Sequence, residues 1–237
     1  IRAVVVGACG GICAEIVRLN DDSPAVSKIL AFSRAGLGNR SSKVANHSID
    51  ITDQQSIARA ASIAADAGPL DLVVVASGLL HRKGVAPEKS MQQFEAAILT
   101  ELYLVNAIGP ALAARHFLPL LRKDAKTVFA ALSARVGSIS DNRLGGWAGY
   151  RASKAALNMF VRTCAIEHAR KFPQSAVIAL HPGTVDTALS RPFSRNVPDD
   201  RLFTPETAAT QLLDVIDSVP AESSGGFFAW DGSKIPF

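Results

Sequence analysis

Short runs of apolar, mostly β-branched residues alternate along the chain with longer segments in which apolar residues recur at helical spacing. The runs that predict strands are residues 1–6, 28–33, 44–49, 70–76, 126–133, 175–181 and 226–230. The segments that predict helices are residues 12–19, 54–67, 91–121, 147–171 and 205–219. Most predicted strands are apolar at successive positions, which is typical of parallel strands covered on both faces. The alternation therefore indicates an α/β fold, with a parallel sheet and helices on both of its faces.

The chain length and composition favour one domain that spans residues 1–237. A chain of 237 residues with 48% hydrophobic and 19% charged residues can bury one substantial core. We find no internal repeat, low-complexity tract or Pro/Gly/Ser-rich linker that would divide it. Two polar, turn-rich insertions, residues 141–146 and 191–201, follow predicted strands, where substrates are usually held in such sheets.

Charge and cysteine content narrow the classes of partner. The net charge of +4 is spread along the chain, which argues against a nucleic-acid partner. A small local group, Arg34, Arg40 and Lys43, suits an anionic small molecule. Three cysteines do not make a disulfide framework and suit a reducing compartment. We see neither an apolar stretch near the ~20 residues of a membrane helix nor a signal peptide, so we expect a cytoplasmic protein with no membrane partner.

A glycine-rich turn follows the first predicted strand and precedes the first predicted helix. It reads VVVGACGGI from Val4 to Ile12 and contains Gly7, Gly10 and Gly11. Glycine lets the backbone turn tightly and lets a pyrophosphate approach the free N–H groups at a helix start, where the dipole favours negative charge. Turns use glycine for other reasons as well, but the order strand, glycines, helix favours a nucleotide site.

The end of the second predicted strand indicates which nicotinamide cofactor would bind. NAD-specific folds usually place an Asp or Glu there for the ribose 2′-hydroxyl, whereas this strand ends in Ser33 and Arg34. A guanidinium can bind a 2′-phosphate in two-pronged fashion, and the hydroxyl can donate a hydrogen bond. We therefore expect NADP(H) to be preferred, with NAD(H) still open and an ordinary surface arginine as the alternative.

Tyr150 and Lys154 stand four residues apart in GYRASKAA, and on a helix they would share one face. Reduction of a carbonyl needs a proton for the developing alkoxide, and a neighbouring ammonium would lower the pKa of the phenol toward a usable value. Such pairs are also common on surface helices.

A second feature is Pro110, four residues after Asn106 in a helical pattern, which should leave the Asn106 carbonyl unpaired and free to hold a water. The alternative for that kink is simple helix packing.

Together these residues resemble the short-chain dehydrogenase/reductase family over essentially the whole chain. Residues 7–13 look like its TGxxxGxG turn, Asp50 and Ile51 like the pair that flanks the adenine, and residues 76–78 like its NNAG segment. Residues 181–187, HPGTVDT, resemble the PGxxxT segment that holds the nicotinamide end. The resemblance implies a Rossmann sheet of seven parallel strands and the cofactor-binding residues Gly7, Cys9, Gly10, Gly11, Ile12, Ser33, Arg34, Asp50, Ile51, Ala76, Ser77, Gly78, Tyr150, Lys154, Pro182, Gly183, Thr184, Val185 and Thr187.

The resemblance also implies the chemistry. Asn106, Tyr150 and Lys154 fall on the catalytic asparagine, tyrosine and lysine of the family. Residues 145–147 and 227–232 look like the branch that contains C-factor signalling proteins and sniffer-type carbonyl reductases. The expected activity is reduction of a carbonyl to an alcohol, or the reverse, on a small-molecule substrate. A cofactor-binding signalling protein with little catalysis and, less favoured, an epimerase or dehydratase are the alternatives, and a homo-oligomer is open.

Three positions depart from the family pattern. Cys13 replaces the third glycine of the turn and could crowd the helix or strand, and Ala76 and Ser77 replace two asparagines. The catalytic serine of the SSxxG pattern is here Ala134. That serine would stabilise the charge on the substrate oxygen. Ser133 and Ser138 are the candidate replacements, and Ser133 could serve only if its strand has ended or bulged there.

Overall fold

Seven parallel strands form the centre of the molecule, in the order β3-β2-β1-β4-β5-β6-β9. In this computed structural model, residues 1–36, 41–195 and 197–237 are described. The strands are β1 (Arg2–Val6), β2 (Lys28–Ser33), β3 (Val44–Ser48), β4 (Leu72–Val75), β5 (Thr127–Leu132), β6 (Ser175–His181) and β9 (Phe227–Ala229). The predicted α/β fold with a seven-stranded parallel sheet is confirmed.

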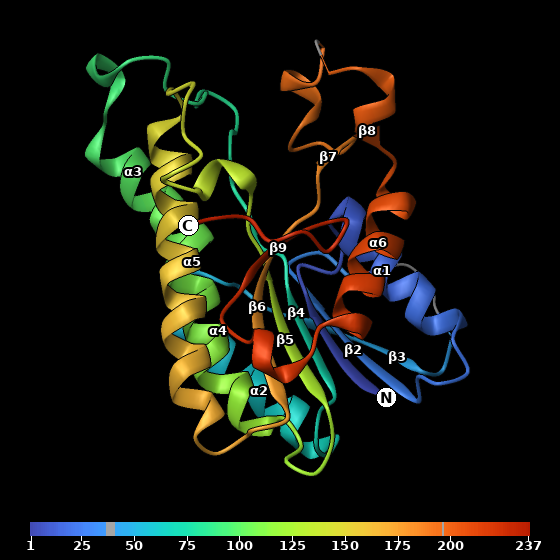
Figure 1. Ribbon diagram of the computed structural model, residues 1–237. Coiled ribbons are helices and arrows are strands. Elements are labelled where there is room, and N and C mark those ends of the chain that lie inside the picture. The colour runs from blue at the N-terminus through green and yellow to red at the C-terminus, as the bar shows by residue number, and fades with distance from the viewer. Residues whose placement is uncertain (37–40, 196) are drawn as a thin grey trace.

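Helices cover both faces of the sheet, as Figure 1 shows. They are α1 (Gly11–Asp22), α2 (Gln54–Asp66), α3 (Ala96–Tyr103), α4 (Gly109–Phe117), α5 (Ala148–Ala169) and α6 (Pro205–Ser218). Alternate strand residues point to opposite faces. Val4 and Val6 therefore pack with α2, α4 and α5 in one buried cluster. Ala3 and Val5 pack with α1 and α6 in the other.

The predicted helix over residues 91–121 is divided in the structure. A 3-10 turn (Met91–Gln93) precedes α3, a π-helical turn (Leu104–Ile108) joins α3 to α4, and another 3-10 turn (Leu118–Leu120) follows. Pro110 has no N–H for the α-helical ladder, and the Gly109 N–H donates to the Leu104 carbonyl, five residues back. A Cβ on Gly109 would lie only 2.5 Å from the Ile51 carbonyl oxygen. The proline therefore produces a π turn in place of the expected simple kink.

The expectation that no segment is long and apolar enough to cross a membrane was wrong for this helical stretch. Residues 96–120 form one helical run of 25 residues, and an 18-residue window within it has a mean hydropathy of 1.5, which is long and apolar enough to cross a membrane by length and composition. In the fold, Ala107, Ala113 and Phe117 of this run are buried in the core against the sheet. Core helices of other proteins pass the same test, so the run is weak evidence for a membrane span.

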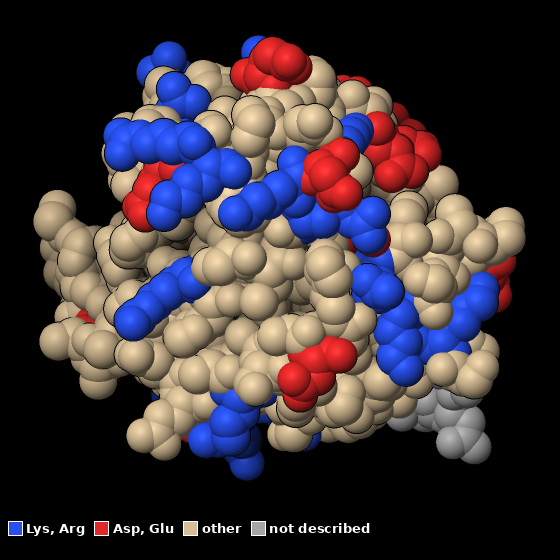
Figure 2. Space-filling model, turned by 90° about the horizontal axis from the view of Figure 1, so that it is seen from below, with Lys and Arg blue, Asp and Glu red and all other residues tan. Residues whose placement is uncertain are grey.

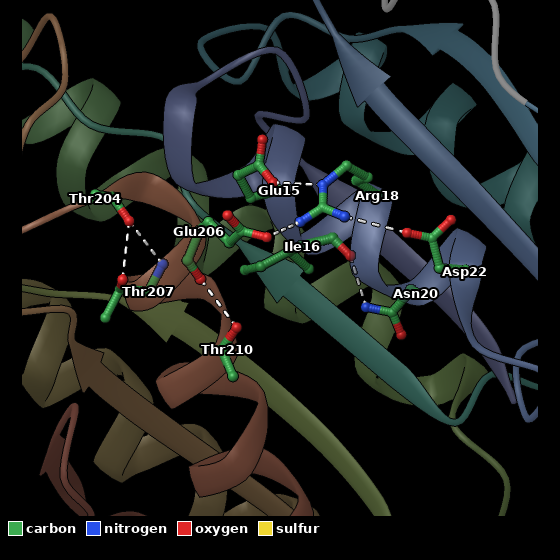
Figure 3. A network of polar contacts seen from close by, with 9 residues as sticks. All are labelled: Glu15, Ile16, Arg18, Asn20, Asp22, Thr204, Glu206, Thr207 and Thr210. Carbon is green, nitrogen blue, oxygen red and sulfur yellow. Dashed lines mark hydrogen bonds and ion pairs between the residues drawn. The ribbon is translucent and has the colours of Figure 1, made fainter.

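Two features hold the segment after β6 in place. Strand β7 (Thr184–Val185) pairs with β8 (Leu202–Phe203) in a small second sheet that the sequence did not predict. Below it, α6 packs against α1, and Arg18 of α1 pairs with Glu206 of α6 at 2.5 Å, as Figure 3 shows. The second half of α1 is thereby tied to the first turn of α6, which follows the small sheet.

The distribution of charge agrees with the expectation of a mixed surface. On the face seen from below, Lys and Arg side chains lie among Asp and Glu side chains (Figure 2). Of the proposed basic group, Arg40 lies outside the described residues. The Lys43 ammonium donates to the carbonyls of Asp21 and Ser23, each at 3.0 Å, so it holds the end of α1.

Candidate active site

A cavity of about 710 Å³ lies at the carboxyl ends of the strands, where open parallel sheets bind their ligands. It extends from the glycine turn after β1 to the start of α5. Sixteen of the residues proposed from sequence line it: Gly7, Gly10, Gly11, Ile12, Arg34, Ala76, Ser77, Gly78, Ser133, Tyr150, Lys154, Pro182, Gly183, Thr184, Val185 and Thr187. Its lining does not include Cys9, Ser33, Asp50, Ile51, Asn106 or Ser138.

The glycine turn has the geometry that a phosphate cradle needs. Gly7 adopts a φ of 88°, and a Cβ there would lie 3.2 Å from the Ala76 carbonyl carbon. Gly10 precedes α1, and the first N–H to bond back to it is that of Ala14. The N–H groups before Ala14 in the first turn of α1 therefore have no partner within the helix. This end of the cavity offers backbone donors and a favourable helix dipole to an anion.

The two cysteines of the turn differ in environment. Cys9 is exposed, whereas Cys13 is 2% exposed and packs in the core beneath α1. Burial raises the pKa of the Cys13 thiol to about 12. The core thus accommodates the side chain that replaces the family's third glycine, and the cavity still lies beside it.

The end of β2 presents Arg34 to the cavity, but its neighbours have other contacts. The Ser33 hydroxyl donates to the Ala35 carbonyl within the turn. Asp50 accepts hydrogen bonds from the Thr52 N–H at 2.9 Å and hydroxyl at 2.7 Å, which, together with the nearby Arg34 guanidinium, lower the pKa of its carboxyl. Arg34 is therefore the residue of this group that faces the cavity.

Tyr150 and Lys154 both lie on the first turns of α5 and both line the cavity. The Lys154 Nζ lies 5.8 Å from the centre of the Tyr150 ring and donates to the Leu132 carbonyl at 2.8 Å. Burial lowers the pKa of Lys154 to about 8. Burial also raises the pKa of Tyr150 above its usual value, so the lowering expected from the lysine is not present in this structure. Loss of solvent stabilises the neutral phenol more than the distant ammonium stabilises the phenolate.

Asn106 is fully buried in the π turn, and its side chain fixes the segment that follows strand β4. Its amide accepts from the Leu79 N–H at 2.7 Å and donates to the Leu79 carbonyl at 2.8 Å and to the Ser153 hydroxyl at 3.0 Å. A Cβ on Gly78 would lie 3.9 Å from both the Asn106 Oδ1 and the Lys154 Nζ. The asparagine and the lysine are thus brought to the same part of the site. The Ser77 hydroxyl donates to the Val105 carbonyl of the same turn at 3.3 Å.

The two candidate serines have different surroundings. Strand β5 ends at Leu132, as the use of Ser133 would require, and Ser133 lines the cavity. Its hydroxyl, however, donates to the Asn158 side chain of α5 at 2.7 Å. Ser138 is 1% exposed, and its hydroxyl accepts from the Asp141 N–H at 3.2 Å. The Ser133 hydroxyl therefore gives its proton to Asn158, and Ser138 does not line the cavity, so neither serine takes the place of the family serine in this structure.

The aromatic side chains of Trp147 and Phe193 form part of the cavity wall. Their ring centres lie 5.0 Å apart, and Phe193 also packs on His81 at 5.4 Å. The His81 Nε2 lies 3.2 Å from the carbonyl oxygens of Ala188 and Leu189. These contacts hold the segment after β7 against the start of α5.

Sequence reasoning missed two polar residues that the structure brings to the site. Glu88 is buried, accepts from the Gly149 N–H at 3.3 Å through its side chain, and accepts from the Trp147 N–H at 2.6 Å through its carbonyl. It thereby fixes the start of α5, where Trp147 adopts a left-handed φ of 53°. His181, the last residue of β6, lines the cavity, and its Nδ1 is buried without a hydrogen-bond partner among the described residues. A histidine at the end of a mostly apolar strand was the available signal for His181, whereas the loop around Glu88 carried no such signal.

The cavity fits a nicotinamide dinucleotide. Its lining combines the glycine turn and helix start, whose unpaired N–H groups suit a pyrophosphate, with the Arg34, Tyr150 and Lys154 side chains. Gly183, which also lines the cavity, has a φ of 77°, and a Cβ there would meet the Phe203 ring at 2.6 Å. Because Gly183 has no side chain, the segment from Pro182 to Thr187 can turn closely beside Phe203 at the cavity wall.

Comparison with known proteins agrees with this geometry. The family model for short chain dehydrogenases matches residues 2–198. A curated relative from Rhodococcus sp. (strain AD45), "1-hydroxy-2-glutathionyl-2-methyl-3-butene dehydrogenase", is 32% identical over 97% of this chain and 96% of its own. The "C-signal" protein of Myxococcus xanthus is 33% identical over 72% of this chain and 94% of its own.

Solved structures share the fold. An NADPH-bound carbonyl reductase from chicken fatty liver superposes with a TM-score of 0.86 at 24% identity, over 100% of this chain and 94% of that one. The carbonyl reductase Sniffer of D. melanogaster superposes with a TM-score of 0.85 at 18% identity, over 100% of this chain and 99% of that one. The chain belongs to the short-chain dehydrogenase/reductase family, and is an oxidoreductase that uses a nicotinamide cofactor.

Proposed function

We propose that this protein reduces a carbonyl compound with NADPH, or oxidises the corresponding alcohol, with Tyr150 as the acid or base. The observation that carries the proposal is that the Tyr150 and Lys154 side chains share one cavity with the glycine turn. When bound, the cofactor supplies the hydride. The residues at the start of α5 then have to hold the substrate oxygen and provide its proton.

The residues around Tyr150 each have a proposed role that agrees with their surroundings. Tyr150 keeps its proton in the buried site and gives it to the substrate oxygen as negative charge develops there. Lys154 is positioned by the Leu132 carbonyl and lies near Asn106, on the route by which a proton returns to the tyrosine. Trp147 and Phe193 supply an apolar wall for the rest of the substrate. The preferred substrates are therefore aldehydes or ketones with an apolar or aromatic body.

Exchange of the tyrosine hydroxyl tests the reaction. Purified protein should oxidise NADPH in the presence of aldehydes, ketones or quinones, and Tyr150→Phe should lower kcat by at least about 100-fold, because the proton donor is lost. Tyr103, the other tyrosine of the chain, lies on the surface of α3, and Tyr103→Phe is the matched control. An absence of turnover in the wild-type protein, or equal kcat in Tyr150→Phe, would contradict the proposal.

The choice of NADPH rests on Arg34, which faces the cavity after β2 where NAD-specific proteins carry an acid. A charge-assisted hydrogen bond contributes about 1.5–3 kcal/mol, so Arg34→Ala should weaken NADPH binding by about 10- to 100-fold and leave NADH binding nearly unchanged. Titration of both cofactors by calorimetry measures this. Arg59→Ala, on the exposed side of α2, is the control. Equal weakening of both cofactors would overturn the assignment of Arg34.

The likeness to the C-signal protein favours a second candidate, a cofactor-binding signalling role with weak catalysis. The alanine at position 134 is the feature of this chain that agrees with it. Binding of NADPH without turnover of any carbonyl in the panel would select this candidate over the reductase.

A further inference from the structure

The proposed reduction, on which this inference rests, needs a second hydrogen-bond donor for the substrate oxygen beside Tyr150. Alanine stands at position 134. The Ser133 hydroxyl donates to Asn158, and Ser138 does not line the cavity. The donor must therefore come from another residue of the same part of the cavity.

His181 lies next to the position that lacks the serine. Leu132 of β5 pairs with Leu180 of β6, and the Ser133 N–H donates to the Leu180 carbonyl at 2.7 Å. The next residues on the two strands, Ser133 and His181, are therefore neighbours. Ala179, two residues before His181, packs in the cluster beneath α5, so alternation directs the imidazole to the α5 side of the sheet. The Ser133 hydroxyl also points to that side, toward Asn158.

The surroundings of the imidazole keep it neutral. Its Nδ1 is buried without a hydrogen-bond partner in the part of the chain that the structure describes, and burial lowers the pKa of His181 to about 4. The charges of two side chains also affect its pKa: Arg135 opposes protonation, and Asp231 favours it. Arg135 is held by an ion pair with Asp141 at 2.6 Å. At neutral pH the ring therefore carries one N–H, and a neutral imidazole can polarise a carbonyl without giving up its proton.

We propose that His181 donates the second hydrogen bond to the substrate oxygen, in place of the family's serine. In the reduction, the hydride of the cofactor goes to the carbonyl carbon and the proton of Tyr150 goes to the oxygen. The imidazole keeps its proton throughout and stabilises the developing negative charge. His181 is thus a catalytic residue of this chain that compensates for Ala134.

A rescue experiment tests this assignment. Removal of one donor to a developing oxyanion typically costs about 100-fold or more in kcat, so His181→Ala should lower kcat by that order while the Kd for NADPH changes less than about twofold. In the His181→Ala protein, the added exchange Ala134→Ser should restore at least about tenfold of the lost kcat, because the serine hydroxyl returns to the family position. In the wild-type background, Ala134→Ser should change kcat by less than about threefold.

Two further variants keep the result interpretable. His181→Gln retains an N–H donor and should lose less kcat than His181→Ala, which covers the case in which the alanine variant folds poorly. His47→Ala, on edge strand β3 outside the cavity lining, should leave kcat unchanged. Full activity of His181→Ala, or no rescue by Ala134→Ser in a folded His181→Ala protein, overturns the role of His181. If Tyr150→Phe loses activity while His181→Ala keeps it, the reductase proposal stands and the role of His181 does not. An inactive wild-type protein overturns both the reductase proposal and the role of His181.

Discussion

Tyr150 and Lys154 both leave water in the first turns of α5, and burial moves their pKa values in opposite directions. The pKa of Lys154 falls to about 8, and that of Tyr150 rises above its usual value. In both groups the neutral form is favoured, because a charge is poorly solvated there. A phenol that holds its proton is suited to act as the acid of a reduction. The sequence placed the two residues on one helix, as the structure has them, but it predicted the opposite direction for the pKa of the tyrosine, since spacing along a helix carries no information about burial.

The glycine turn offers a prediction about single cysteines. Cys9 is exposed and Cys13 is buried with a pKa of about 12, so only the first should react readily with a thiol reagent at pH 8. Burial also raises the pKa of Cys164, which should react slowly. Titration of the native protein with Ellman's reagent should show one fast thiol, and Cys9→Ser should remove the fast phase. A fast phase that persists in Cys9→Ser would show that the turn opens.

At the scale of elements, the apolar runs predicted the bounds of some strands to the residue. Strands β2 and β6 begin and end at the predicted residues. Strand β4 begins at Leu72, two residues late, because Leu70 instead forms an isolated bridge with Leu121. The small pair β7 and β8 was not predictable from local pattern. It depends on pairing between residues that are distant in sequence, which no periodicity records.

The candidate site, like the strands, contains residues that the sequence predicted and residues that it missed. Glycines, Tyr150 and Lys154 were found because their chemistry requires particular residue types at fixed spacing. Glu88 and His181 were missed because the residues that surround them in the fold, Gly149 for Glu88 and Ser133 for His181, are distant in sequence.

Glu88 provides the prediction at this scale. Its carboxylate meets the Gly149 N–H at the start of α5, where the helix dipole favours negative charge. Glu88→Ala should lower the free energy of unfolding by about 1–3 kcal/mol, because this buried contact is lost, and should lower kcat because Tyr150 follows directly. Denaturant titration and NADPH turnover measure the two effects. Glu95→Ala, an exposed residue before α3 whose side chain makes no capping hydrogen bond, should stay within about 0.5 kcal/mol of wild type. Equal effects of the two variants would contradict the role given to Glu88.

At the scale of the whole molecule, the parallel sheet explains how distant residues form one site. All seven strands run in the same direction, so their carboxyl ends share one edge, where Gly7, Ser133 and His181 each follow or end a strand. Two buried clusters, one on each face, fix the sheet between the helices. The chemistry therefore depends on the stability of the entire core, and conditions that weaken the core should weaken the site.

Acid should weaken this core through two histidines. Burial lowers the pKa values of His168 and His181 to about 4, from 6.5. As the pH falls from 6.5 toward 4, the unfolded chain takes up these protons before the native protein does, so the free energy of unfolding decreases. Each histidine contributes at most about 1.4 kcal/mol per pH unit in this window. Urea titrations at intervals of half a pH unit should show this slope, and His168→Gln and His181→Gln should each reduce it by about half. A slope that neither substitution changes would mean that other groups cause the acid sensitivity.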